Sequence, residues 1–204
     1  MVAVAAAWVL HTLSGTFVVG IDRTAFMRHK VAGGFTPWPG WRVVLAIHAS
    51  TAAIAVAAGV AGVVLQATRR WAWHRRAGKT YVIAVLLSAT AGLPLAVTAT
   101  GGPVAAAGFL VLDLLWISIT IAGYITIRRR QLDEHRKLMY RSYALTLANT
   151  SLHVLLVPLT RLVGDRLDAY RIAIWLCFTL NLLLVEIYLG WAARRQHVNL
   201  PTTG

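Results

Sequence analysis

The stretch HRRAGKTY, residues 74–81, lies between two long apolar runs, and a similar stretch, HRKLMYRSY, follows at residues 135–143. Each begins with His-Arg and ends with a cation, a hydroxyl residue and a tyrosine, and each is preceded by a pair of arginines. We call residues 69–81 the first basic turn and residues 129–143 the second basic turn. Since each turn joins one apolar run to the next, the repetition predicts two helical hairpins of the same topology.

The composition around these turns is that of a membrane protein. Of the 204 residues, 58% are hydrophobic and 13% are charged, whereas soluble domains carry about 25% charged residues. Several apolar runs reach the roughly 20 residues that cross a ~30 Å hydrocarbon core. We therefore expect a single all-α integral membrane domain over residues 1–204 with six transmembrane helices. The expected spans are residues 2–20, 43–66, 80–100, 104–127, 142–163 and 171–193.

The middle four spans are expected to form the two pseudo-repeated hairpins, one from the second and third spans and one from the fourth and fifth. The hairpins would pack as a four-helix bundle flanked by the first and sixth spans. Repeats of this kind are related by an axis along the membrane normal. Pro94 and Pro158 each lie inside a span and are expected to kink their helices, because proline removes a backbone hydrogen bond.

The net charge of +13 does not indicate a nucleic-acid partner, because the cations lie in short loops between apolar runs. Of the 20 Lys and Arg residues, 13 fall on the side that holds both basic turns and both termini. The positive-inside rule then predicts that both termini are cytoplasmic, with membrane lipids as partners. Cys177 is the only cysteine, which excludes a disulfide within the chain.

Ionisable residues within the expected spans are functional candidates, because they are costly inside a membrane. They are His11, His48, Asp113, His153 and Glu186. A rise of about 1.5 Å per residue places His11, Asp113 and His153 at similar depth in the outer half of the membrane. His48 lies closer to the outer surface, and Glu186 lies nearer the cytoplasm. Asp113 and the histidines would share one cavity if their helices were suitably rotated.

The basic turns are candidates for binding anions such as a lipid phosphate, because arginines and helix N-termini favour negative groups. The candidate residues are Arg75, Arg76, Lys79, Tyr81, Arg136, Arg141 and Tyr143. Simple anchoring at the headgroup level explains the cations and the tyrosines. It does not explain why two histidines, His74 and His135, occupy matched positions.

One hypothesis for the histidines is a b-type haem, held by two histidines at similar depth on different helices of a bundle. The candidate ligands are His11, His48, His74, His135 and His153. The pairs His11–His153 and His74–His135 both meet the depth condition. His135 and His153 are 18 residues apart, or about 27 Å along one continuous helix, which does not fit two stacked haems.

Two other kinds of function stay open. A membrane-embedded enzyme would act on a lipidic or isoprenoid small molecule, with Asp113 as the acid and Glu186 as a further catalytic candidate. A proton- or metal-coupled transporter, or an assembly subunit, would use the same polar residues to relay protons or to join helices. The sequence has no Gly-rich phosphate loop and no His-Glu-x-x-His pair, so no nucleotide site and no dedicated metal site is predicted. The oligomeric state is not indicated.

Three of these features together resemble the bacterial family of predicted membrane proteins known as domain-of-unknown-function family 2306. They are His48 near the outer start of its span, HRRAGKTY, and the stretch HRKLMYRSYALTLA that opens the fifth span. The resemblance covers roughly residues 43–160 and implies a multi-span protein of the bacterial inner membrane, without implying a reaction. The chain departs from the family pattern at Leu138, where tryptophan is usual, and at His153, where arginine is frequent.

Overall fold

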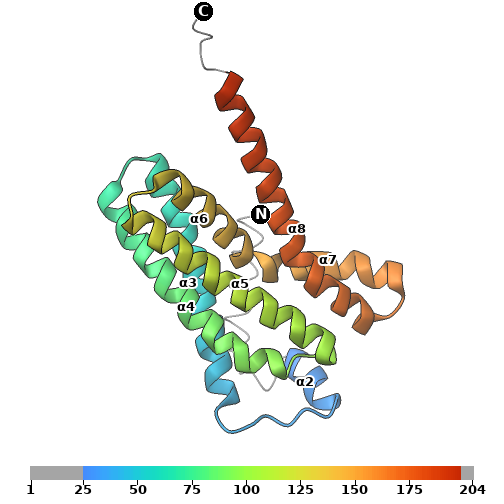
Figure 1. Ribbon diagram of the computed structural model, residues 1–204. Coiled ribbons are helices and arrows are strands. Elements are labelled where there is room, and N and C mark those ends of the chain that lie inside the picture. Colours follow the sequence, from blue (N-terminus) through green and yellow to red (C-terminus); the bar gives the residue numbers. More distant parts are fainter. Residues whose placement is uncertain (1–24, 199–204) are drawn as a thin grey trace, which may run out of the picture.

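The computed structural model describes residues 25–198, and every regular element in that range is a helix (Figure 1). The predicted all-α class is therefore confirmed for this part of the chain. The helices are α2 (Ala25–Ala32), α3 (Trp41–Ala67), α4 (Trp71–Val97), α5 (Gly102–Arg128), α6 (Leu132–Thr146), α7 (Ala148–Val163) and α8 (Arg166–Val198).

Four of these helices, α3, α4, α5 and α8, are long and apolar enough to cross a membrane, and α6 with α7 makes a fifth if the bent pair counts as one span. The predicted spans 43–66, 104–127 and 171–193 lie within α3, α5 and α8. Helix α4 starts well before the predicted span 80–100, so the first basic turn is largely helical. The predicted span 2–20 lies outside the described residues, and the total of six spans stays a prediction.

Helices α3, α4, α5 and α6 lie side by side, and both basic turns are at the same end of this group (Figure 1). The two connections share one backbone geometry. Arg69 and Arg130 each have a left-handed φ, of 57° and 60°. The N–H of the following residue, Arg70 or Gln131, donates to the carbonyl of the fifth residue before it, at 2.9 and 3.0 Å. These bonds are those of a Schellman turn, in which glycine is the usual left-handed residue.

The prediction of one continuous helix over residues 142–163 is wrong, because the helix is interrupted at Leu147. Helix α6 ends at Thr146, α7 begins at Ala148, and the two are bent by 47° relative to each other. Pro158, where a kink was expected, lies inside α7. Helix α7 therefore turns away from the bundle and runs beside α8 (Figure 1). The estimate of 27 Å between His135 and His153 assumed a straight helix and does not apply.

The bend has a specific cause in α8. The side-chain amide of Asn181 donates to the carbonyl of Ala144 at 2.9 Å, while its oxygen accepts the hydroxyl proton of Ser151 at 2.9 Å. The N–H of Leu147 is shared between that carbonyl at 3.3 Å and the carbonyl of Tyr143, four residues before it, at 3.2 Å. A side chain that takes over a carbonyl of the helical ladder is a known cause of helix kinks. Asn181 thus holds α6 and α7 at their angle.

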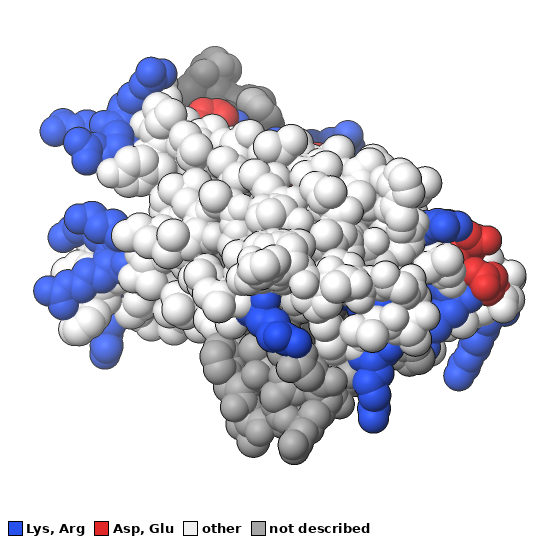
Figure 2. All heavy atoms as spheres, turned by 90° about the horizontal axis from the view of Figure 1, so that it is seen from below, with Lys and Arg blue, Asp and Glu red and all other residues white. Residues whose placement is uncertain are grey.

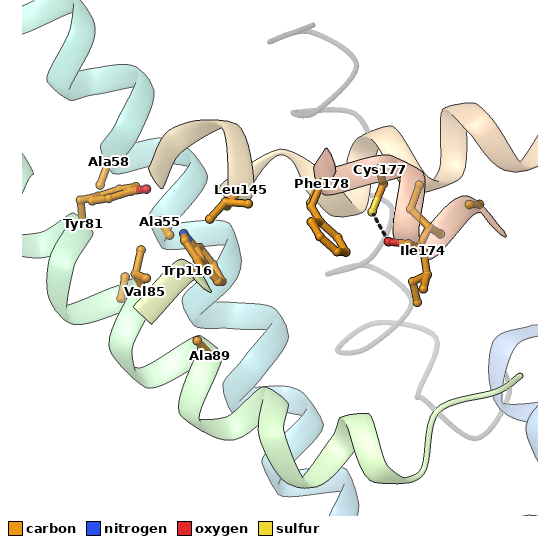
Figure 3. Close-up of a cluster of buried hydrophobic side chains, with 14 of the residues drawn as sticks. Ala55, Ala58, Tyr81, Val85, Ala89, Trp116, Leu145, Ile174, Cys177 and Phe178 are labelled. Atoms are coloured by element: carbon orange, nitrogen blue, oxygen red, sulfur yellow. Dashed lines mark hydrogen bonds between the residues drawn. The ribbon is translucent and has the colours of Figure 1, made fainter. Parts of the chain in front are cut away.

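The buried core extends from the α3–α6 bundle to the contact between α5 and α8 (Figure 3). Tyr81 and Trp116 lie in the first part, and Ile174 and Cys177 lie in the second. Gly108 of α5 allows close approach of α8, because a Cβ atom there would lie 2.4 Å from the Cγ2 atom of Ile174. Small residues of this kind let helices pack closely where lipid gives no hydrophobic driving force.

Helix α2 is attached to the far end of α4 by a buried lysine. The Lys30 ammonium group donates to the carbonyl of Thr98 and lies over the ring of Phe35, 4.4 Å from its centroid. Trp41 adds a bond from its indole N–H to the Thr98 hydroxyl at 3.3 Å. Burial lowers the pKa of Lys30 below its ordinary value. These contacts close the end of the bundle opposite the basic turns.

The surface is divided in the way expected of a membrane protein. On the face drawn in Figure 2, most Lys and Arg side chains lie toward two opposite ends, and uncharged residues cover most of the area between them. Many large apolar side chains of the long helices are more than half exposed, among them Val63 and Leu184. Lipid is the solvent that such a surface favours.

Candidate functional site

The histidines of the two basic turns make the same hydrogen bond. His74 Nδ1 lies 2.9 Å from the carbonyl oxygen of Gly62, and His135 Nδ1 lies 2.8 Å from that of Gly123. A carbonyl oxygen only accepts, so Nδ1 is the donor in each pair. In the neutral ring the other nitrogen, Nε2, then keeps its lone pair. Each histidine links its own helix to the preceding helix and still presents a possible ligand atom.

These two imidazoles occupy equivalent places in the two hairpins. Both side chains are half-buried, and both basic turns lie at the same end of the bundle. The ring of Trp71 lies edge-on to His74, with 6.2 Å between the ring centroids. Two imidazoles from separate helices therefore lie at one end of the bundle.

Below the histidines, a group of buried hydroxyls joins α4, α5 and α6. The Tyr81 hydroxyl lies 2.7 Å from the hydroxyls of both Ser142 and Thr146. The Thr120 hydroxyl lies 2.6 Å from that of Ser142, and the indole N–H of Trp116 donates to Thr146 at 3.1 Å. We call these five residues the hydroxyl network.

One assignment of protons uses every donor of the hydroxyl network. Thr146 donates to the main-chain carbonyl of Ser142 at 3.0 Å, so it accepts from Trp116 and Tyr81. Tyr81 then accepts from the Ser142 hydroxyl, which in turn accepts from Thr120. A fully satisfied polar network stabilises a buried site, and an incomplete one is costly. The network therefore fixes how α4, α5 and α6 pack.

Tyr81→Phe is expected to lower the free energy of unfolding by about 1–2 kcal/mol, because Ser142 loses an acceptor and Thr146 loses a donor. Titration of the purified protein from mild detergent into denaturing detergent, followed by circular dichroism, measures this loss. Tyr124→Phe is the matched control, since Tyr124 is exposed and, within residues 25–198, its hydroxyl bonds only to Arg128, at 3.5 Å. Equal stability of Tyr81→Phe and Tyr124→Phe would contradict the assigned role of the network.

Asp113 lies on the same buried face of α5 as Trp116 and Thr120. Its side chain is only 6% exposed and packs on Gly92 of α4, where a Cβ atom would lie 2.4 Å from Oδ2. Within residues 25–198, no hydrogen bond or ion pair to its carboxyl group is found. A buried carboxyl without a partner is expensive in a membrane and is a functional candidate for that reason.

His48 lies near this region. Its Nδ1 atom is 2.9 Å from the carbonyl of Ser88, and the Ser88 hydroxyl donates to the His48 carbonyl at 3.0 Å. Ser88 precedes Gly92 by one helical turn, so His48 and Asp113 contact neighbouring turns of α4. His153 is half-buried on α7, beyond the bend, and His11 lies outside the described residues. In the part of the chain that the structure describes, no three or more His, Cys, Asp or Glu side chains are grouped to hold a metal ion.

The predicted anion-binding and acidic residues lie in different surroundings. Arg141 forms a two-point ion pair with Glu186 of α8, at 2.6 and 2.9 Å. Tyr81 belongs to the hydroxyl network, and the buried hydroxyl of Tyr143 has no hydrogen-bond partner among the described residues. The remaining candidates are exposed cations of the two basic turns. They are Arg75, Arg76, Lys79 and Arg136.

Several residues of this region were not predicted from the sequence. They are Ser88, Gly92, Thr120, Ser142, Thr146 and Asn181. The signal was weak, because single Ser, Thr, Gly and Asn residues are common in transmembrane helices. The spacing of Ser142 and Thr146, four residues apart on one helix face, was the available clue.

Comparison of the chain with other proteins agrees with the motifs around His48 and the basic turns. The model of the family described as "Predicted membrane protein (DUF2306)" matches residues 45–189, which include α4 to α7 and most of α3 and α8. No curated protein and no solved structure matches the chain. Since the family model covers well over half of the sequence, the chain belongs to this family of predicted membrane proteins.

Proposed function

We propose that this protein is a histidine-ligated b-type haem protein of the membrane, in which His74 and His135 would hold the haem. The observation that carries the proposal is the matched bond from each Nδ1 atom to a glycine carbonyl, at 2.9 and 2.8 Å. Such a bond fixes the tautomer and the orientation of a ligating histidine and makes Nε2 the ligand atom.

The donor set suits this group. Two neutral imidazoles on separate helices are the ligands of many haems in helical bundles. A haem held by these two imidazoles would supply one-electron transfer. The residues of this chain would hold the rings in place through Gly62 and Gly123, and the Trp71 ring would restrict the position of His74.

The proposal includes the membrane topology. Both termini would be cytoplasmic in a bacterial inner membrane, with six spans and the two hairpins as a pseudo-repeat. Support comes from the equal turn geometry at Arg69 and Arg130, residues that are 61 positions apart, as are His74 and His135. When the two turns are aligned at their histidines, Tyr81 is equivalent to Ser142, and these two residues share a hydrogen bond of 2.7 Å. Contacts between equivalent residues are expected close to an axis that relates two repeats.

Absorption spectroscopy of the full chain tests the haem proposal. Protein purified in mild detergent from a haem-supplied host is expected to show a Soret band and, after dithionite, α and β bands. His74→Ala and His135→Ala are each expected to lose these bands. His48→Ala is the matched control, since His48 Nδ1 is also 2.9 Å from a main-chain carbonyl, and its bands should persist.

Folding is checked separately by circular dichroism and elution volume. His74→Met and His135→Met keep a ligand atom and are expected to shift the bands and raise the reduction potential. A colourless wild-type protein that also fails to bind added haemin would overturn the proposal. Loss of the bands in His48→Ala, with His74→Ala unchanged, would assign the ligands elsewhere.

A second candidate function rests on Asp113. Its buried carboxyl, without a partner in residues 25–198, lies one helical turn from Trp116, and this pair suits an enzyme that acts on a lipophilic small molecule. Asp113→Asn would then abolish turnover while the spectrum and the fold persist. For the transporter hypothesis, the described contacts of Glu186 offer no comparable support, because its carboxylate is paired with Arg141.

A further inference from the structure

The two basic turns are alike in backbone but differ in how their cations are compensated. In the second basic turn, Arg136 lies 3.8 Å from Asp133 and Lys137 lies 2.7 Å from Glu134. Arg141 is paired with Glu186 of α8. Three of the five cations in this turn therefore have an acidic partner within the protein.

The first basic turn has five cations and no acidic residue. All five are exposed, and none has an acidic partner in residues 25–198. They are Arg69, Arg70, Arg75, Arg76 and Lys79. Left without internal partners, these side chains concentrate positive charge at one hairpin end, where it is available to an external anion.

Two exposed tryptophans in the same turn indicate at which level of the membrane these cations lie. Trp71 is 50% exposed and Trp73 is 57% exposed, and the Arg76 guanidinium lies over the Trp73 ring, 4.8 Å from its centroid. Tryptophan prefers the boundary between headgroups and acyl chains. Val63 and Val64, near the end of α3, are exposed just before the turn. Cations, interfacial rings and apolar side chains thus follow one another along the hairpin end.

From this arrangement we propose that the first basic turn is a binding site for an anionic phospholipid, and that the second is not. The lipid phosphate pairs with Arg75, Arg76 and Lys79, while its acyl chains lie along the exposed valines of α3. The guanidinium groups match phosphate geometry, and the tryptophan rings cover the glycerol region. The site is independent of the haem proposal, because it uses neither His74 nor His135.

A charge-matched pair of triple variants tests the site. Arg75→Gln, Arg76→Gln and Lys79→Gln are combined in one protein, and Arg130→Gln, Arg136→Gln and Lys137→Gln in the other. Delipidated protein in neutral detergent is titrated with phosphatidylglycerol or phosphatidylcholine, and bound lipid is counted by native mass spectrometry. The first triple is expected to weaken phosphatidylglycerol binding about a hundredfold, since each surface cation adds about fivefold. The second triple is expected to weaken it less than about threefold.

Several results would overturn the proposal. Equal losses of phosphatidylglycerol binding in the two triple variants would show that binding depends on net positive charge and not on the first basic turn. Equal binding of phosphatidylcholine would show that the site does not require an anionic headgroup. Displacement of the lipid by millimolar inorganic phosphate would assign the turn to a soluble anion instead. Circular dichroism and elution volume verify that both triples are folded, and the single variant Lys79→Gln, with a smaller loss expected, replaces a triple that does not fold.

Discussion

Asn181→Leu is expected to lower the free energy of unfolding by about 2–3 kcal/mol, because two partly buried hydrogen bonds between helices are lost together. The amide of Asn181 bonds to the Ala144 carbonyl and accepts from Ser151, each at 2.9 Å. Without the amide, the angle between α6 and α7 has no support from α8 at this point. Denaturing-detergent titration gives the stability, and a pair of spin labels on α6 and α7 reports the angle.

Asn149→Leu is the matched control for this experiment. Asn149 lies at the start of α7, close to the same bend, but its side chain is exposed. The same chemical change there should alter the free energy of unfolding by less than about 0.5 kcal/mol, as at most surface positions. If both variants were equally stable and the distance between the labels were unchanged, Asn181 would not be the cause of the bend.

Gly92→Ala is expected to destabilise the wild-type protein by about 1–3 kcal/mol, the usual effect of forcing an extra methyl group into a packed interior. The new Cβ atom would lie 2.4 Å from Oδ2 of Asp113 and 3.0 Å from its Cγ. In an Asp113→Ala background the same change should cost almost nothing. The four proteins form a double-mutant cycle, and the expected coupling energy is about 1–3 kcal/mol.

Gly78→Ala serves as the control within the same helix. A Cβ atom at Gly78 would meet no atom within 4 Å. Alanine there should leave the stability of the protein unchanged or raise it by up to about 1 kcal/mol, because alanine lowers the conformational entropy of the unfolded chain. If Gly92→Ala were equally destabilising in the Asp113→Ala background, a neighbour other than Asp113 would be the one that clashes with a Cβ atom at residue 92.

The long apolar helices were predictable because each has a strong local signal. Residues 43–66 and 104–127 are almost without charge, and a membrane requires spans of about this length. The turns between them were also visible, because their arginines and histidines repeat along the sequence. The left-handed backbone conformation that Arg69 and Arg130 share could not be predicted, since glycine rather than arginine usually adopts this conformation.

The break at Leu147 shows why the fifth span could not be predicted in full. No glycine or proline, the usual helix-breaking residues, lies next to Leu147 in the sequence. The proline of the predicted fifth span, Pro158, lies eleven residues further on. The cause is a side chain on α8, more than 30 positions away in the sequence. Hydropathy reports how long a run is, but it carries no information about which carbonyl a distant amide will take.

The candidate site was predicted in part for the same reason. Asp113 and the histidines stand out because charge is rare in apolar segments. Their partners do not stand out, since Gly92 contributes only the absence of a side chain and Gly62 only a carbonyl. Depth along a helix was available from the sequence, whereas rotation about its axis depends on packing. The ionisable groups of the candidate site could therefore be predicted from the sequence, but the residues that contact them could not.

The bond from Asn181 also sets an order of events during synthesis. The chain leaves the ribosome from its N-terminus, so α6 and α7 emerge before α8. Until then the Ala144 carbonyl is free to bond within a straight helix, as its sequence favours. The bend is completed only when α8 arrives, so the last helix inserted determines the final shape of the segment before it.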